Sequence, residues 1–410
     1  MQQTCICAVI IACHLEKRAV RHLATMPGHD APGVLQWNFA RHAIDTSAWR
    51  LDVYIFTLTK ETMFLRSSTT LLALLVLMMG SAIAADIKKP IKHYLYFNHR
   101  ELNGENITSD KALSDPRFSG AQIVYTWRSL EPEQDRYDFS AIRHDIAYLD
   151  SIGKKLWIQL QEKSFTPRHN VPAYLLSDPR YQGGIIKQSM LSAPERDPNK
   201  AVTDDEYGWS PKMWEVPVRE RYQRLIQALG KEFDGKIEGI NFSESSIDIG
   251  VEDSKGNTIF PDDFKPQQYV DAIKENMRVL AGAFPHTTTM VYLNFLPGEW
   301  LPWTDKGYMR SLFAQAQTLQ MGVGGPDLMP YRKSHMGQSY GFIKNYPANL
   351  VKGMAVQDGN LRQINPRTKK KNSVEDLLDF ARNYLGLDYI FWVEDEPYFS
   401  NEVLKKLPVH

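Results

Sequence analysis

Cysteine is almost absent from this chain of 410 residues, since only Cys5, Cys7 and Cys13 occur, all near its start. The rest of the chain therefore has neither disulfides nor thiolate chemistry. After residue 84 it also lacks H-x-x-x-H and H-E-x-x-H pairs, which removes the usual ligands of a hydrolytic zinc site. No G-x-S-x-G elbow and no phosphate-binding P-loop occurs. We expect neither a metal nor a cofactor.

An excess of charge is missing as well. The 48 basic residues equal the 48 acidic ones, so the formal net charge is zero. A neutral chain is a poor binder of nucleic acid or of anionic membranes, and we expect neither as a partner. The length suffices for one large core, such as a barrel of about 250 residues with insertions.

Long apolar runs are also missing. The longest, residues 71–79, is too short to cross a membrane, which needs about 20 residues. It follows Arg66 and precedes Ala82-Ile83-Ala84, an A-x-A cleavage pattern. Residues 63–84 are therefore predicted to be a signal peptide that is cleaved after Ala84.

Because this predicted signal lies inside the chain, it bears on where the protein starts. Residues 1–62 are predicted to be an upstream extension outside the fold, with Met63 as the real start; a genuine extension with a signal anchor is the alternative. Residues 85–410 are the predicted mature protein. We expect a bacterial protein that is secreted or periplasmic, has no membrane anchor after cleavage, and is a monomer.

Beyond residue 90 short β-rich runs alternate with helical periods, the pattern of an α/β fold. A capping pattern, Ser373 with Asp376, marks the start of a late helix. Eight strands account for the predicted mature chain, which favours one (β/α)8 barrel over a doubly wound sheet. The predicted strands are 94–98, 122–126, 155–160, 237–242, 289–294, 321–324, 351–357 and 388–393.

One connection is much longer than the others. Residues 161–215, after the third strand, show no sustained periodicity. Long irregular loops in compact domains are usually functional or disordered, and this one would overhang the catalytic end of a barrel. We interpret it as a wall of a cleft, with a plain insertion as the alternative.

The second predicted strand leads into an informative motif. It ends in Trp127-Arg128, continues through Leu130-Glu131-Pro132 and reaches Tyr137-Asp138-Phe139 before a helix. This run resembles the second βα unit of the (β/α)8 glycoside hydrolases of the clan A type. The resemblance implies a TIM barrel that cleaves glycans with two carboxyl groups at the carboxyl ends of its strands.

In that family the proton donor is a Glu at the end of the fourth strand, usually directly after an Asn. Here Asn241 and Glu244 stand at this position, separated by two residues. The resemblance implies that Glu244 is the catalytic acid. A loop carboxylate that caps a helix or pairs with an Arg is the alternative.

The second carboxyl group has several candidates. The family has a Glu after the seventh strand, where this chain has Asp358, in an Asp-Gly pair that also suits a simple turn. After the eighth strand, Trp392 and Glu394 share one face. If Trp392 faces the barrel axis, Glu394 is the second candidate. Asp327, after the sixth strand, is a further acid at the rim.

Sugar rings bind by aromatic stacking and by hydrogen bonds to their hydroxyl groups. For each aromatic residue, ordinary core packing is the alternative. Trp300 and Trp303 are additional loop candidates. The predicted substrate-binding residues are Trp127, Arg128, Gln159, Asn241, Asn294, Trp392 and Tyr398.

The sequence thus predicts an exported glycoside hydrolase that acts on an oligosaccharide or polysaccharide. Two alternatives remain open. One is a glycan-binding barrel without activity, which the missing Glu after the seventh strand favours. The other is a transglycosylase that processes an exopolysaccharide with the same residues.

Overall fold

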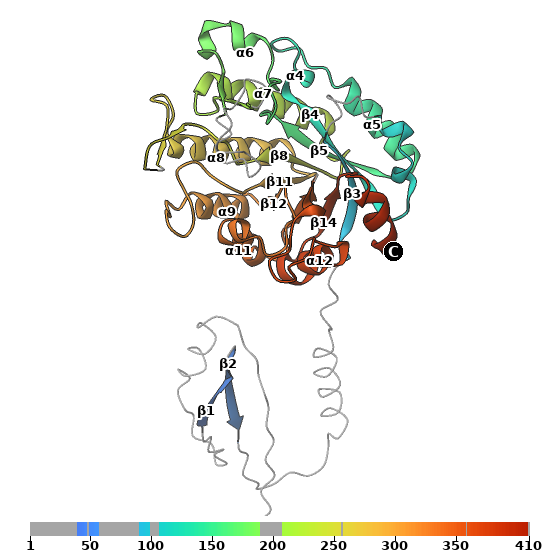
Figure 1. Cartoon of the computed structure of the whole chain (residues 1–410), viewed down its shortest axis with the longest axis vertical. Coiled ribbons are helices and arrows are strands. Elements are labelled where there is room, and N and C mark those ends of the chain that lie inside the picture. The colour runs from blue at the N-terminus through green and yellow to red at the C-terminus, as the bar shows by residue number, and fades with distance from the viewer. Residues whose placement is uncertain are drawn as a thin grey trace, which may run out of the picture. The chain divides into compact units, whose positions relative to one another are not determined.

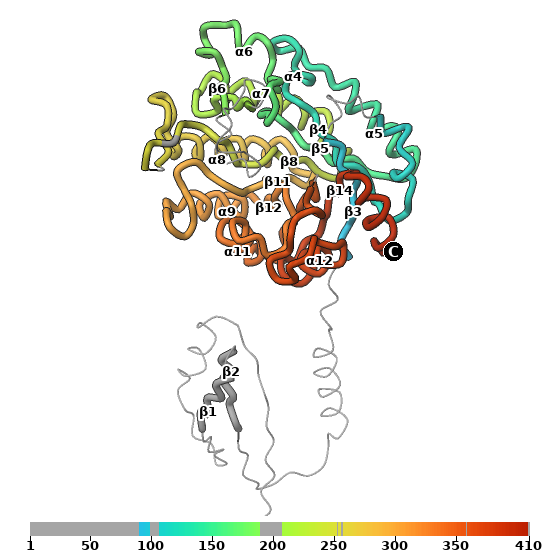
Figure 2. The backbone as a smooth tube through the Cα atoms, viewed as in Figure 1, coloured from blue at the N-terminus to red at the C-terminus, as the bar shows by residue number. Residues whose placement is uncertain are grey.

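Eight parallel strands close into a barrel in the computed structural model of the chain. The structure describes residues 39–46, 49–56, 90–98, 106–188, 207–255, 257–357 and 359–408. All eight predicted strands are confirmed, and the last pairs with the first (Figure 2). They are β3 (Lys92–Phe97), β4 (Phe118–Thr126), β5 (Lys155–Gln161), β8 (Gly239–Glu244), β11 (Thr288–Tyr292), β12 (Gly322–Gly325), β13 (Lys352–Val356) and β14 (Tyr389–Trp392).

Helices surround the strands, as Figure 1 shows. Each apolar stripe at helical spacing packs on the outer face of the sheet. The capping box predicted at Ser373 and Asp376 is confirmed at the start of α12. The helices are α4 (Trp127–Leu130), α5 (Ser140–Ser151), α6 (Tyr174–Ser177), α7 (Val216–Phe233), α8 (Pro266–Ala283), α9 (Tyr308–Thr318), α10 (Lys333–Gly337), α11 (Tyr340–Asn345), α12 (Val374–Asp379) and α13 (Leu404–Lys406).

The barrel interior is filled by aromatic side chains from alternate strand positions. Trp157 lies at its centre and packs against Tyr389 and Phe391, with ring centroids 4.8 and 5.1 Å away. Gly239 makes room for this ring, since a Cβ there would lie 2.6 Å from the Trp157 side chain. The interior is therefore a packed core and not a channel.

The turn after β4 is held by a buried carboxylate. Glu131, with no exposed surface, accepts hydrogen bonds from the Trp127 indole (2.8 Å) and from the Asp135 backbone (3.0 Å). It also forms an ion pair with Arg221 of α7. The motif 127–139, which carries the family resemblance, thus has a structural role: the ion pair of Glu131 with Arg221 joins the turn after β4 to α7.

The long connection between β5 and α7 contains short elements. After α6 and a single turn (Pro179–Tyr181) comes a two-stranded antiparallel sheet of β6 (Ile185–Lys187) and β7 (Trp209–Pro211). Ser164, just after β5, pairs through its backbone with Trp209 in both directions (2.8 and 3.0 Å). The first part of the connection is thereby fixed over the carboxyl end of the barrel.

The chain divides into two units, Met1–Ile87 and Lys88–His410. In the first, β1 (Phe39–Thr46) and β2 (Trp49–Phe56) form an antiparallel hairpin. The predicted signal peptide, residues 63–84, lies outside the described residues. Among the residues that the structure does describe, no helix is long and apolar enough to cross a membrane.

Candidate functional site

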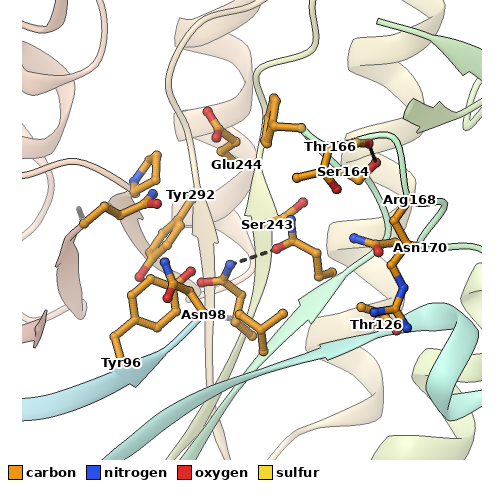
Figure 3. Close-up of a pocket in the computed structure, with 16 residues that line it drawn as sticks. Tyr96, Asn98, Thr126, Ser164, Thr166, Arg168, Asn170, Ser243, Glu244 and Tyr292 are labelled. Carbon is orange, nitrogen blue, oxygen red and sulfur yellow. Dashed lines mark hydrogen bonds between the residues drawn. The ribbon is translucent and has the colours of Figure 1, made fainter. Parts of the chain in front are cut away.

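A cavity of about 240 Å³ opens at the carboxyl end of the barrel. Its walls come from the ends of seven strands and from the loop after β5. Figure 3 shows Tyr96 and Tyr292 on one side, Arg168 and Asn170 on the other, and Ser243 between them. The lining residues are Tyr96, Asn98, Val124, Thr126, Gln159, Gln161, Ser164, Phe165, Thr166, Arg168, Asn170, Ser243, Glu244, Tyr292, Pro326 and Gln357.

The chemistry of this lining is mainly neutral and polar. Side-chain amides and hydroxyl groups dominate, and they both donate and accept hydrogen bonds, as sugar hydroxyl groups require. Among the described lining residues, Glu244 is the only acid and Arg168 the only Lys or Arg. A carboxyl group surrounded by neutral hydrogen-bonding side chains suits a polar, uncharged ligand with many hydroxyl groups.

A local irregularity brings Glu244 to the cavity. Along the β8–β11 pair, Met290 is opposite Asn241 and Tyr292 is opposite Glu244, so β8 has one more residue than β11 over this stretch. Such a bulge redirects the side chain that follows it. It explains why Glu244 stands three positions after Asn241 and still reaches the pocket.

The environment of Glu244 favours its protonated form. Burial raises the pKa of this carboxyl to about 7, and the negative charge of Asp327 adds to the increase. The Asn294 amide, which donates a hydrogen bond to Oε2, and the charge of Lys163 both lower the pKa. A carboxyl with a pKa near 7 is suited to donate a proton at neutral pH.

A buried charged group supports Glu244 from behind. Lys163 donates a hydrogen bond to the Glu244 backbone carbonyl, lies 3.3 Å from the Tyr269 hydroxyl, and forms a 3.3 Å ion pair with Glu162. Glu162 also accepts a hydrogen bond from Ser243 (2.8 Å). The ends of β5 and β8 are therefore locked together beside the cavity.

Asp327 is the next carboxyl group to consider. It follows β12, next to the lining residue Pro326, and accepts a hydrogen bond from Asn360 (3.0 Å). Burial raises its pKa, while the Asn360 hydrogen bond and the charge of Arg332 lower it. The charge of Asp327 raises the pKa of Glu244, so the two carboxyl groups interact at the carboxyl end of the barrel.

Four of the predicted site residues gather at or near the cavity. Glu244 and Gln159 line it. Asn294 contacts the Glu244 carboxyl and also accepts hydrogen bonds from Ser245 and Ser246. Asn241 lies below, fully buried, where its Oδ1 accepts hydrogen bonds from Gln122 (2.9 Å) and Trp157 (2.7 Å).

The predicted aromatic residues of the strand ends lie elsewhere. Trp127 is fully buried and starts α4, because β4 already ends at Thr126. Phe391 and Val393 occupy the inward positions, so Trp392 faces the outer layer. Its indole N–H donates a hydrogen bond to Nδ1 of His93 (3.1 Å). The condition under which Glu394 would be the second carboxyl, a Trp392 that faces the barrel axis, is therefore not met.

Among the described residues, the other predicted ones, Glu394, Arg128 and Tyr398, do not line the cavity either. Glu394 shares the outward side of Trp392 and is exposed. The backbone N–H of Arg128 donates to the carbonyl of Asn170 at the cavity rim. The Tyr398 hydroxyl accepts a hydrogen bond from Lys371 (3.2 Å). Asp358 lies outside the described residues, directly after the lining residue Gln357.

Sequence reasoning missed several lining residues. Tyr96, Asn98 and Gln357 lie at strand ends, so their position alone was a signal. Thr166 and Asn170 belong to an irregular loop, in which no periodic pattern indicates direction. No cluster of three or more potential metal ligands occurs within the described ranges.

No family model and no curated protein matches this chain. Solved structures with similar folds include xylanase 10B from Thermotoga petrophila in complex with xylobiose, at 11% identity and a TM-score of 0.42 over 75% of this chain and 82% of that one. A psychrophilic glycoside hydrolase family 10 endo-β-1,4-xylanase has 11% identity and a TM-score of 0.44 over 74% and 86%. The catalytic domain of a β-amylase from Paenibacillus polymyxa has 7% identity and a TM-score of 0.47 over 74% and 92%.

At such low identity the likeness concerns the fold. The barrel that the resemblance implies is confirmed by the eight closed parallel strands themselves. What the protein does has to be inferred from the residues of its own cavity.

Proposed function

We propose that the protein hydrolyses a glycosidic bond and that Glu244 donates the proton to the leaving oxygen. The observation that carries the proposal is the Glu244 carboxyl, the one acid among the described residues that line a cavity of amide and hydroxyl groups at the carboxyl end of the barrel; burial raises its pKa to about 7. Protonating the leaving group needs an acid that still holds its proton at working pH.

The second carboxyl group must be ionised, because it either attacks the sugar or activates water. Asp327 is our candidate among the described residues, since it directly follows the lining residue Pro326 and its charge raises the pKa of Glu244. Asp358 remains a candidate because its neighbour Gln357 lines the cavity.

A glycan-binding barrel without activity is the second candidate function. The specific observation in its favour is the segment after β13, where the resemblance implies a Glu: the chain has Gln357, an amide that lines the cavity, followed by the shorter Asp358. This function needs the polar cavity but no proton donor. It predicts that the neutral variant of Glu244 binds glycans as well as the natural protein does.

The test follows reducing-end release by the full-length protein from xylan, starch, mannan and galactan. We expect cleavage of at least one, and a loss of about 10²- to 10⁴-fold in Glu244→Gln. Glu396→Gln, a change of an exposed Glu outside the cavity, is the matched control. Asp327→Asn and Asp358→Asn then identify the partner. Binding by the natural protein without cleavage would favour the second candidate.

We further propose that the protein acts outside the cytoplasm as a monomer on an oligosaccharide or polysaccharide. The predicted signal peptide, residues 63–84, supports this location. Fractionation of cells that express the full chain tests it. The expected result is a processed product in the periplasm or medium whose N-terminus is Ala85.

A further inference from the structure

The exposed aromatic rings of this protein share one end of the barrel. Among the described residues, three Phe, Trp or Tyr side chains are exposed, namely Phe165 (38%), Trp300 (47%) and Trp303 (72%). Phe165 lies in the loop after β5, and both Trp residues lie in the loop after β11. These loops leave the carboxyl ends of strands, as the walls of the cavity do.

The loop after β11 is firmly anchored from below. The buried Glu299 carboxylate accepts hydrogen bonds from the backbone of Lys306 (3.1 Å), Tyr308 (2.7 Å) and Met309 (2.9 Å) at the start of α9. Trp300 and Thr304 exchange two backbone hydrogen bonds (3.1 and 2.8 Å). The exposed rings are thus presented on a fixed backbone.

The rings are also connected to the cavity. The Trp300 ring stacks on the Phe295 ring, with a centroid distance of 5.4 Å and an interplanar angle of 13°. The His335 ring packs edge-on against Phe295, with a centroid distance of 5.2 Å. Phe295 directly follows Asn294, which donates a hydrogen bond to Glu244. The aromatic surface therefore begins at Phe295, the residue after Asn294, which contacts the Glu244 carboxyl.

The size of the cavity indicates what this surface is for. At about 240 Å³ it is smaller than the roughly 300–1,000 Å³ of a usual small-molecule site. Any glycan longer than the cavity must leave it along the barrel rim. Rigid exposed Trp rings are costly in water, and they commonly mark a surface where a ligand covers them.

We propose that Trp300 and Trp303 form a glycan-binding platform outside the cavity, so that the natural ligand is a polysaccharide chain and not a short sugar. This inference rests on the proposed function for the position of the reacting bond. Binding to the platform itself needs no catalysis. The fixed loop and its continuity with the cavity favour a glycan over a protein or a lipid surface.

The test compares the full-length protein with Trp303→Ala and with the double variant Trp300→Ala and Trp303→Ala. Binding to immobilised xylan, starch, mannan and galactan is measured beside cleavage of the matching short oligosaccharides. We expect the double variant to lose about tenfold in polysaccharide affinity, the effect of losing one or two stacking contacts. Its activity on the short oligosaccharides should fall much less than its affinity for the polysaccharide. Val251→Ala, which truncates an exposed apolar side chain of another loop, is the control.

The outcomes separate the two proposals. Polysaccharide binding that depends on the Trp pair, without cleavage by the natural protein, would support the platform and contradict the hydrolase. Cleavage of polysaccharides that is insensitive to both Trp changes would overturn the platform alone. Failure to bind any of the four polysaccharides, or Trp-dependent binding only to vesicles or to a second protein, would also overturn the platform.

Discussion

Two glutamates, one in the turn after β4 and one at the end of β8, have opposite environments. Glu131 is completely buried, and the Trp127 indole, the Asp135 backbone and Arg221 bind its oxygens. Glu244 receives a hydrogen bond from Asn294 and borders an open cavity. The comparison teaches that burial alone does not identify a catalytic acid. What matters is whether a carboxyl is already bound by fixed donors or is open to a ligand.

The largest effect on stability is expected at Glu131. Glu131→Gln removes the buried charge partner of Arg221 and leaves it paired with the exposed Asp135; breaking a buried ion pair typically costs about 3–5 kcal/mol of unfolding free energy. Urea denaturation measures this loss. Adding Arg221→Met should cost less than the sum of both single changes, because the pair acts as one unit.

The stability and activity of Glu131→Gln can be compared directly with those of Glu244→Gln. Glu244→Gln should not lower the urea midpoint at neutral pH, because the amide keeps the shape and replaces a carboxyl whose ionisation burial opposes. Purified Glu131→Gln that still folds should keep its activity per folded molecule. If Glu131→Gln abolished activity at full stability, the roles assigned to the two residues would be reversed.

The second prediction concerns pH. With a pKa of about 7, Glu244 loses its proton above neutrality, so activity should fall about tenfold per pH unit on the alkaline side. Stability follows the same sign, since the folded state holds this proton more tightly than an exposed carboxyl does. The contribution of Glu244 is complete below pH 4.5 and is lost as the pH rises through about 7.

The third prediction concerns Asn294 and the alkaline limb of the activity profile. Its hydrogen bond to the Glu244 carboxyl lowers the pKa. Asn294→Ala should therefore raise the pKa of Glu244 and shift the alkaline limb of the activity profile to higher pH. Asn257→Ala, at an exposed loop, is the control. An alkaline limb that stays in place would show that another group controls it.

The smallest effect is expected at Trp392, which the sequence suggested as a binding residue. Trp392→Phe removes the hydrogen bond to His93 and part of a buried ring, at a cost of about 1–2 kcal/mol. KM should not change, because this side chain faces the helices. Thermal unfolding and KM measured side by side test this; a several-fold rise in KM would place Trp392 in the site after all.

These contrasts show which features of the fold could be predicted from the sequence. The eight strands were predictable, because each is a short apolar run between polar segments. The inward or outward direction of Trp392 was not, since a parallel strand is buried on both faces and its apolar residues do not alternate. Trp127 could have been placed in a helical turn, because Thr126 and Ser129 form a cap at its start.

The candidate site was only partly predictable for a similar reason. The position of Glu244 followed from counting strands, but the bulge in β8 that brings it to the cavity has no sequence signature. Lys163 and Glu162 look like an ordinary charged pair after a strand. Their burial beside Glu244 depends on residues of β8 and α8, which are more than 80 positions away along the chain.

The most direct measurement is the titration of the glutamate carboxyl groups by 13C NMR in the full-length protein, with Glu244→Gln as the assignment control. The account predicts one carboxyl that titrates near pH 7 and is missing from the spectrum of Glu244→Gln. If Glu244 instead titrates near 4.5, like an exposed glutamate, it is ionised at neutral pH and its role as proton donor is contradicted.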